Sequence, residues 1–349
     1  MKKKWIVVPS LLALAMAGAI AASPSEPKVA VDRAARQEVI DTLVAKLNDH
    51  YVFPDKAKQI EAALRQRQRE GKYDAVSDAK QLAKQLTDDM RAVAADGHME
   101  VFFSPRPVPA DDAMPPPPKT RAEWEQHVPA DKLPTFLQMA DRSVEQKHLT
   151  PRIGYLKVSM FPPPFLMGER YAAAMNQLAD TDGLIVDLRN NSGGGPDTVA
   201  LLVSYFVDQR TRLNDIWDRD TGISTPFWTE DKLDGKRYGG KKPVLILTGP
   251  RSMSAGEDFA YTMQAMKRAT VIGEPTWGGA HPTRPYRLAE HFLASIPTRR
   301  TISPITKTNW EGVGVIPDVK AKPDDALALA RDMLERRLQG SGAPAAAGQ

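Results

Sequence analysis

Ser254 stands at the point where a short apolar run gives way to a helical pattern. Residues 244–247 (VLIL) have the length and branching of a buried strand, and Phe259, Met263 and Met266 follow at helical spacing. A helix that begins near Ser254 turns its free N–H groups and the positive end of its dipole toward the serine. These groups stabilise a developing oxyanion, so the stretch indicates a nucleophilic serine.

The same stretch also fits a structural role. Ser254 and Glu257 have the spacing of a capping box, in which the serine side chain caps the third helical N–H and the glutamate reaches back. Serine is favoured at helix N-termini for that reason alone. The two roles are compatible, because a nucleophile at a helix N-terminus also occupies the cap region. Ser254 is therefore a candidate nucleophile whose partners must come from elsewhere in the chain.

A glycine-rich loop, RNNSGGGP over residues 189–196, follows a second apolar strand over residues 183–188. Glycines there let backbone N–H groups face a ligand without obstruction by a Cβ atom. A plain turn and a phosphate cradle are the alternatives. The loop has no Gly-Lys-Ser/Thr ending and no G-x-G-x-x-G after the strand, which argues against phosphate. An oxyanion or carboxylate site is the preferred interpretation.

The segments around these two loops alternate between strand and helix. Strands are predicted at residues 152–160, 183–188, 244–247 and 270–272, and helices at residues 171–178, 199–206 and 259–266. This order is typical of βαβ crossovers and of an α/β core with parallel strand pairs, whose ligands lie at the carboxyl ends of strands. Residues 151–338 are predicted to form this catalytic core, with residues 283–302 as an antiparallel extension and residues 339–349 as a disordered tail.

The chain before the core divides into two parts. Residues 22–103 carry three helical stripes and then an alternating strand, which predicts an N-terminal three-helix module that ends in a strand. His98 lies at the mouth of that strand, after an Asp-Gly turn, and an isolated histidine is more often a surface residue than a base. Residues 104–150 are rich in proline, which favours an extended linker or a flap over a cleft.

Residues 1–21 have the organisation of an export signal, with three lysines, an apolar run and small residues at the cleavage position. The run is short for a membrane-spanning helix, so no stable membrane anchor is expected and the protein is predicted to be periplasmic or secreted. Those lysines carry most of the formal net charge of +4, and nothing basic remains to suggest nucleic acid. The chain has no cysteine, which excludes disulfides and a cysteine nucleophile.

Four motifs in order, GLIVDLRNNSGGG, SMSAGEDFAY, VIGEPTWGGAH and WEGVGVIPDV, resemble the tail-specific or C-terminal processing serine peptidases. The branch that contains tricorn protease and the modules of interphotoreceptor retinoid-binding protein is the most similar. The YVFP-bearing helices and DGHMEVFF resemble the amino-terminal part of that branch. The resemblance implies an α/β core akin to the crotonase and Clp-protease spiral of βα units, with Ser254 as the nucleophile.

The general base must be argued residue by residue. The better known processing peptidases use a lysine in a Thr-aromatic-Gly-Lys-Gly segment, and Gly279 stands in the place of that lysine. The tricorn-like arrangement implies instead a histidine that matches His98 and an acid that matches Glu311. In that arrangement a serine stands before the histidine and links the histidine to the acid. Gly97 stands at this position in this chain. A link between Glu311 and His98 would then be direct, run through water, or be absent.

The resemblance implies the roles of a serine hydrolase. His98 would take the Ser254 proton and return it to the leaving amine, and Glu311 would orient the imidazole or balance its charge. His281 follows Gly279 closely in the chain and is the alternative base.

The expected oxyanion hole consists of backbone N–H groups, from Ala255 and from Gly193 or Gly194. The sequence shows no metal-ligand cluster, and neither a metal nor a cofactor is expected. We therefore expect an exported serine peptidase that cleaves peptides or unfolded polypeptides. The alternative is a non-enzymatic carrier of apolar, retinoid- or lipid-like ligands, as the retinoid-binding relatives suggest. The sequence leaves the oligomeric state and the cleavage specificity open.

Overall fold

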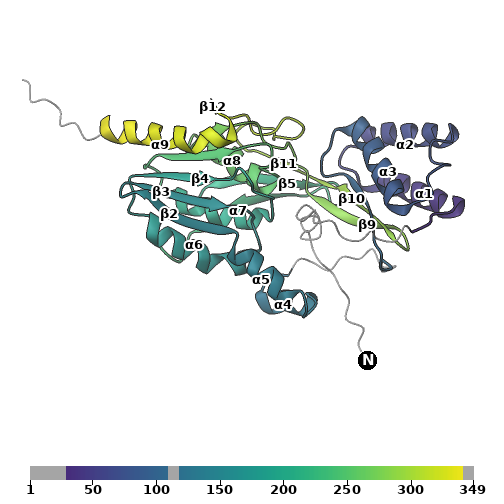
Figure 1. Ribbon diagram of the computed structural model, residues 1–349, viewed down its shortest axis with the longest axis horizontal. Coiled ribbons are helices and arrows are strands. Elements are labelled where there is room, and N and C mark those ends of the chain that lie inside the picture. The colour runs from purple at the N-terminus through teal and green to yellow at the C-terminus, as the bar shows by residue number, and fades with distance from the viewer. Residues whose placement is uncertain (1–28, 109–117, 341–349) are drawn as a thin grey trace, which may run out of the picture.

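The computed structural model describes residues 29–108 and 118–340. Figure 1 shows a mixed α/β molecule in which three N-terminal helices lie at one end and a large twisted sheet lies toward the other. Among the helices in these two ranges, none is long and apolar enough to cross a membrane.

The N-terminal helices form because apolar residues recur on one face of each, and two of them have an aspartate cap. They are α1 (Arg33–His50), α2 (Pro54–Arg69) and α3 (Ala79–Ala94). Asp32 caps α1 by accepting the Ala35 N–H at 2.8 Å. Asp78 caps α3 in the same way, at 2.9 Å from the Gln81 nitrogen.

A three-stranded antiparallel sheet connects this module to later parts of the chain. Its strands are β1 (Glu100–Phe103), β10 (Phe292–Pro297) and β9 (Thr283–Ala289), in that order. The sheet packs on the helices, and one hydrophobic core holds Leu43, Leu86, Leu288 and Ile296. The pairing of β1 with β10 fixes the segment that carries His98 against a distant part of the sequence.

The large sheet has six strands in the order β12-β8-β7-β4-β3-β2. They are β2 (Val144–Thr150), β3 (Ile153–Val158), β4 (Gly183–Asp187), β7 (Val244–Thr248), β8 (Thr270–Gly273) and β12 (Val319–Lys320). All neighbours pair in parallel except β2, which pairs antiparallel with β3 at one edge. The central strands β4 and β7 are buried throughout, which explains their near-continuous apolar sequences.

Helices cover both faces of the large sheet (Figure 1). One face packs on α6 (Pro164–Leu178), α7 (Pro196–Val203) and α8 (Ala255–Ala265), and the other packs on α9 (Pro323–Gly340). Successive residues of a strand point to opposite faces, so Val186 and Ile246 belong to the first core and Ile185 and Leu247 to the second. The loops that leave the carboxyl ends of β4 and β7 are thus held side by side.

The remaining elements lie outside these layers. A third sheet has the order β11-β5-β6 and consists of β5 (Arg212–Asp218), β6 (Ser224–Trp228) and β11 (Arg299–Ile302). The helices α4 (Arg121–His127) and α5 (Leu133–Asp141) precede β2, and a 3-10 turn (Ser204–Phe206) follows α7.

The predicted parallel-rich α/β core and the N-terminal helical module are confirmed, with two differences in detail. Of the expected linker at residues 104–150, residues 121–127 and 133–141 form α4 and α5, and residues 144–150 form β2, an edge strand with no buried side chain, which conceals the strand pattern. Residues 283–302 do not extend the large sheet, because β9 and β10 pair with β1 and β11 pairs with β5. The expected export signal at residues 1–21 lies outside the described residues, and so does most of the expected tail.

Candidate active site

Ser254 lies directly before α8, after the carboxyl end of β7. Its backbone has φ 50° and ψ −112°, a conformation that non-glycine residues rarely adopt. Such strain costs on the order of 1–3 kcal/mol and persists only where the surrounding structure enforces it. The turn sets the serine beside the free N–H groups of the first helical turn.

The carboxylate of Glu257 holds this turn in place. It is completely buried and accepts the Ser254 N–H at 2.8 Å. It also accepts the N–H groups of Gly278 and Gly279, at 2.6 and 3.0 Å, and the Thr276 hydroxyl at 2.6 Å. Burial raises the pKa of Glu257, and these donors oppose the rise. Glu257 therefore forms its half of the predicted cap and also fixes the loop that contains Gly279 beside the serine.

The glycine loop lies against the serine turn because β4 and β7 are neighbours. A Cβ atom on Gly193 would lie 3.0 Å from the Ser254 Cβ, and one on Gly194 would lie 2.0 Å from the Phe161 carbonyl oxygen. The φ values of these glycines are 92° and 142°, which other residues rarely adopt. Both positions therefore require glycine.

Asn191 connects the two loops. Its fully buried side chain accepts the Gly193 N–H at 2.9 Å, and its backbone carbonyl accepts the Met253 N–H at 2.8 Å. The Gly193 N–H is therefore already engaged. The N–H groups of Gly194 and Ala255 have no acceptor among the described residues. These two groups are the donors that the site leaves for an oxyanion.

His98 lies over the loop that contains Gly279. A Cβ atom on Gly279 would lie 2.3 Å from the Trp277 ring and 2.6 Å from the His98 Cε1, so these two rings fill the space that a side chain at position 279 would need. The Trp277 ring packs edge-on against the imidazole, with ring centroids 4.8 Å apart. Burial lowers the pKa of His98 to about 4, against the opposing charge of Asp96. The imidazole is therefore neutral near pH 7, the form that a general base needs.

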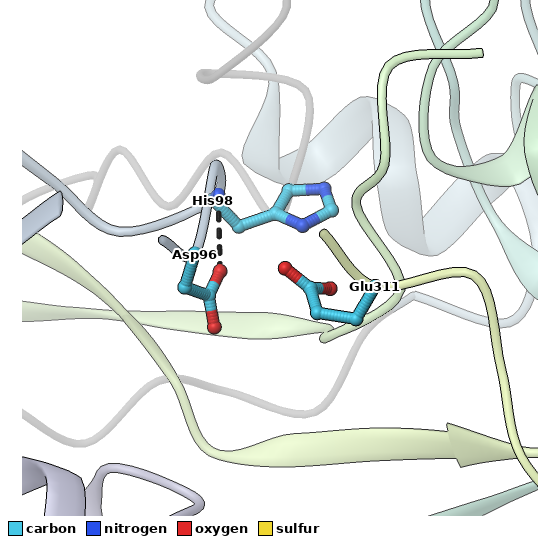
Figure 2. Close-up of side chains that lie close together, drawn as sticks. All are labelled: Asp96, His98 and Glu311. Atoms are coloured by element: carbon cyan, nitrogen blue, oxygen red, sulfur yellow. Dashed lines mark hydrogen bonds between the residues drawn. The ribbon is translucent and has the colours of Figure 1, made fainter. Parts of the chain in front are cut away.

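Glu311 faces His98 from the chain that follows β11. Figure 2 shows one ring nitrogen of His98 turned toward the Glu311 carboxylate and the other pointing away. One nitrogen of His98 and one oxygen each of Asp96 and Glu311 lie within 4.8 Å of one another. His98 Nδ1 and Glu311 Oε1 are shielded from solvent and have no hydrogen-bond partner among the described residues. An unpaired imidazole nitrogen and an unpaired carboxylate oxygen thus lie close together.

The second oxygen of the Glu311 carboxylate is held from another side. Oε2 accepts the Ala280 N–H at 2.5 Å and lies 3.3 Å from His281 Nδ1. Burial, followed by the nearby charge of Asp96, raises the pKa of Glu311 to about 7, against the opposing effects of His281 and the Ala280 N–H. Glu311 therefore changes its charge near neutral pH.

Gly97 allows His98 and Glu311 to approach each other without a serine between them. A Cβ atom on Gly97 would lie 2.6 Å from the Trp277 ring, so a side chain at position 97 has no room while Trp277 keeps its place. His98 Nδ1 and Glu311 Oε1 are both shielded from solvent, and neither has a hydrogen-bond partner among the described residues. The structure therefore shows no hydrogen bond between the two residues, and a direct link would require a shift of either side chain.

His281, the alternative base, has a different environment. It is almost fully buried, and its Nδ1 lies 2.9 Å from Asp96 Oδ2 and 3.3 Å from Glu311 Oε2. The Tyr51 hydroxyl donates to the same Asp96 oxygen at 3.3 Å, and the Phe53 ring packs edge-on against the imidazole. The Nδ1 of His281 is thus committed to the two acids.

A pocket of about 440 Å³ opens beside these groups. Asp96, His281 and Glu311 contribute to its lining, together with Tyr51 and Phe53 from the connection between α1 and α2. The first turns of α2 complete the opposite wall. The pocket therefore lies where the N-terminal module meets the later part of the chain.

Three residues that build the site were assigned no role from the sequence. Asn191 joins the two loops, and its place in the motif RNNSGGG was the signal that could have identified it. Asp96 was interpreted only as a turn residue, although it lies two positions before His98. Trp277 belongs to the Trp-Gly-Gly motif, but its contact with His98 depends on the pairing of distant segments.

Two family models match the chain. The model of peptidase family S41 matches residues 152–321, and the model of the N-terminal domain of this family in eukaryotic IRBP matches residues 27–130. Together they cover most of the chain and include Ser254, His98 and Glu311. The chain therefore belongs to peptidase family S41, a family of serine-type peptidases.

Individual relatives agree with this assignment. Over 180 residues the chain is 27% identical to the carboxyl-terminal-processing peptidase 2, chloroplastic, of Arabidopsis thaliana. The matched region covers 48% of this chain and 32% of that protein. Over 172 residues it is 28% identical to the tricorn protease of Thermoplasma volcanium, and this matched region covers 48% of this chain and 15% of that protein. The crystal structure of mature CPAF has a TM-score of 0.58 at 11% identity, over 88% of this chain and 99% of that one, and shares the fold. The chain thus matches less than half the length of these two curated relatives.

Proposed function

We propose that the chain is an exported serine peptidase in which Ser254 is the nucleophile, His98 the general base and Glu311 the acid that orients the base. The observation that carries the proposal is the juxtaposition of His98 Nδ1 and Glu311 Oε1, which are both buried, unpartnered and close together. When Nδ1 donates to an acid, Nε2 is left with a lone pair that can accept the serine proton.

The position of His98 above Gly279 also supports its role as the base. Together with the Trp277 ring, the imidazole fills the space that a side chain at position 279 would need. The Gly279 N–H and the Ser254 N–H bind the same Glu257 carboxylate, which keeps this space close to the serine. The base thus enters the site from the segment before β1. The resemblance implies that other processing peptidases instead supply a lysine from the loop that contains Gly279 in this chain.

The proposed reaction follows from these positions. The Ser254 oxygen attacks the peptide carbonyl carbon while its proton passes to His98 Nε2, and the N–H groups of Gly194 and Ala255 hold the resulting oxyanion. The imidazolium then gives the proton to the leaving amine, which leaves an acyl-enzyme. A water molecule, deprotonated by the same imidazole, releases the acid product. Ionised Glu311 stabilises the imidazolium in both steps.

The proposed substrate is a peptide or an unfolded polypeptide that is cleaved near its carboxyl terminus. Two relatives are named carboxyl-terminal-processing peptidase 2 and carboxy-terminal processing protease CtpB, which supports this choice. Export is proposed from the signal pattern of residues 1–21 alone.

The carrier hypothesis receives no comparable support. The pocket of about 440 Å³ is lined by charged groups as well as aromatic rings, among them Asp55, Lys56, Asp96 and Glu311. Burying an apolar ligand against ionised side chains would cost solvation free energy that no contact returns. The peptidase is therefore the function that the geometry favours.

A fluorophosphonate probe tests the proposal directly, because it reacts with a serine only when a base activates that serine. We expect one label per chain, located on Ser254 by mass spectrometry of the digested protein. Ser254→Ala should abolish the labelling, whereas Ser224→Ala, which changes an exposed serine of β6, should retain a label on Ser254. An unlabelled wild-type protein that is folded by circular dichroism would refute the serine-peptidase assignment.

A further inference from the structure

We propose that Asp96, His98 and Glu311 form a binding site for a divalent transition-metal ion such as Zn²⁺, and that the bound ion inhibits the peptidase. Asp96 and His98 lie in the turn before β1, whereas Glu311 follows β11. The structure brings one ligand atom of each residue within 4.8 Å of the other two (Figure 2). Because Glu311 is far from Asp96 and His98 in the sequence, no motif revealed this cluster.

The donor set suits Zn²⁺ better than Mg²⁺ or Ca²⁺. One imidazole nitrogen and two carboxylate oxygens are common zinc ligands, whereas the harder cations prefer oxygen ligands alone. Tetrahedral zinc with bonds of about 2.0–2.2 Å needs its ligand atoms about 3.4 Å apart, so the ligand atoms, which lie within 4.8 Å of one another, must approach by up to about 1.4 Å. A neutral imidazole, two carboxylates and a divalent ion have no net charge, which removes the repulsion between two buried acids.

Two of the three ligands have an atom without a partner. His98 Nδ1 and Glu311 Oε1 are shielded from solvent and make no hydrogen bond with the described residues. Buried polar atoms of this kind are uncommon and need an explanation. A lone pair on each of these atoms is what a metal ion requires, so an ion would satisfy both at once.

Surrounding hydrogen bonds already orient the third ligand. Asp96 Oδ1 accepts the His98 N–H at 3.2 Å, and Oδ2 accepts the Tyr51 hydroxyl at 3.3 Å and lies 2.9 Å from His281 Nδ1. Outer partners of this kind fix the orientation of metal ligands. The pocket of about 440 Å³ is lined by Asp96 and Glu311 and offers an entry path for the ion.

Inhibition follows from the chemistry of the imidazole and rests on the proposed function. A metal ion on Nδ1 uses the lone pair of that nitrogen and forces the ring proton onto Nε2. The nitrogen that must accept the Ser254 proton is then already protonated. The ion also withdraws Glu311 from the imidazole, so a metal-bound site has neither a base nor an orienting acid.

Isothermal titration of the purified chain with ZnCl₂ tests the binding. We expect one Zn²⁺ per chain. Asp96→Asn and His98→Ala should each weaken binding by at least about tenfold, since the loss of an outer partner alone costs about 10–100-fold. Ser254→Ala should bind Zn²⁺ as the wild type does, because the serine is not a ligand. His148→Ala, which removes an exposed histidine of β2, is the matched control and should also bind normally.

Fluorophosphonate labelling tests the inhibition. Zn²⁺ should abolish labelling of the wild-type protein, EDTA should restore it, and Mg²⁺ at the same concentration should have no effect. Compared with the wild type, Asp96→Asn should need at least about tenfold more Zn²⁺ for half-inhibition of the labelling rate that it retains. Zinc binding that leaves the wild-type labelling rate unchanged would overturn the inhibitory part of the proposal.

Two results would overturn the metal site itself. The first is tight Zn²⁺ binding that persists in His98→Ala, and the second is binding that falls equally in His148→Ala. Where circular dichroism shows that Asp96→Asn is unfolded, Glu311→Gln provides the same test with a variant of equal size. A finding that Ser254→Ala keeps peptidase activity would refute the proposed function but would leave the zinc titrations interpretable.

Discussion

The two halves of the proposed active site differ in how completely their polar groups are paired. Around Ser254, the Glu257 carboxylate accepts four hydrogen bonds, and Asn191 binds both loops. Around His98, by contrast, the Nδ1 atom and the facing oxygen of Glu311 are unpaired. The first half is held rigidly by satisfied buried groups, and the second contains buried groups whose partner is still to be supplied.

This difference separates positioning from proton transfer. A strained serine turn needs a surrounding network that leaves it no alternative conformation, and the network at Glu257 provides this. A base must instead gain and lose a proton during each turnover, and its hydrogen bond to the acid must accommodate both states. The pKa values shifted to about 4 for His98 and to about 7 for Glu311 occur in the unpaired half, where a perturbed group has a catalytic use.

The largest expected effect separates the two imidazoles. His98→Ala should lower kcat on a peptide substrate by on the order of 10³–10⁶, because it removes the group that accepts the serine proton. His281→Ala should retain activity within about tenfold, since His98, and not His281, lies over Gly279 beside the serine turn. Steady-state kinetics of both variants provides the comparison. The assignment is wrong if the two variants exchange these phenotypes.

Glu311→Gln should lower kcat by on the order of 10²–10⁴, because an amide cannot stabilise the imidazolium as a carboxylate does. In the wild type, the acidic limb of the pH–kcat profile should lie near pH 7, where Glu311 ionises, because His98 with a pKa of about 4 is already neutral there. This limb should disappear in Glu311→Gln. A limb that stays near pH 7 in the variant would show that another group controls it.

Although Glu311→Gln should lower kcat, it should raise the free energy of unfolding at high pH. The folded protein holds the Glu311 proton more tightly than the unfolded chain, so this group makes the protein less stable as pH rises from about 4.5 to about 7. Glu311→Gln removes the loss and should gain on the order of 3 kcal/mol relative to the wild type between pH 4 and pH 8. Urea unfolding at the two pH values measures the difference. His98, with a lowered pKa, contributes the opposite slope between about pH 4 and 6.5 in both proteins, so its effect cancels.

Glu257→Gln should disrupt the rigid half of the site. An amide places an N–H₂ group where the carboxylate now accepts four donors, so at least one buried donor loses its partner. We expect a loss of about 1–3 kcal/mol of unfolding free energy, together with a fall in kcat. Asp258→Asn, one position further along α8, is the matched control for the removal of a half-buried acid in the same helix. Equal stability of Glu257→Gln and the wild type would contradict the role assigned to this network.

The smallest effect concerns the residue before His98. Gly97→Ser should destabilise the protein by about 1–3 kcal/mol, because its Cβ atom would lie 2.6 Å from the Trp277 ring. The double variant Gly97→Ser with Trp277→Leu has a smaller side chain facing the serine and should recover part of this loss. Chemical unfolding of the single and double variants measures the coupling. Additive effects of the two substitutions would show that the contact is unimportant.

The sequence by itself determined the local features of this protein. Apolar runs and helical spacing predicted the α/β core and the three N-terminal helices, because burial of one face depends on local periodicity. The Ser254–Glu257 spacing and the glycine loop indicated a site at the ends of β4 and β7, since adjacent parallel strands bring their carboxyl ends together. The resemblance added His98 and Glu311 as partners but could not choose among a direct, a water-mediated and an absent link.

Only the tertiary structure decided how the distant residues meet. The pairing of β1 with β10 and the contact between His98 and Trp277 place the imidazole over Gly279, and neither follows from a local pattern. The polar edge strand β2 and the cluster of Asp96, His98 and Glu311 were missed for the same reason. Charge and burial at such a cluster depend on residues far apart in the chain, so the folded arrangement alone sets which atoms are paired and which are free to react.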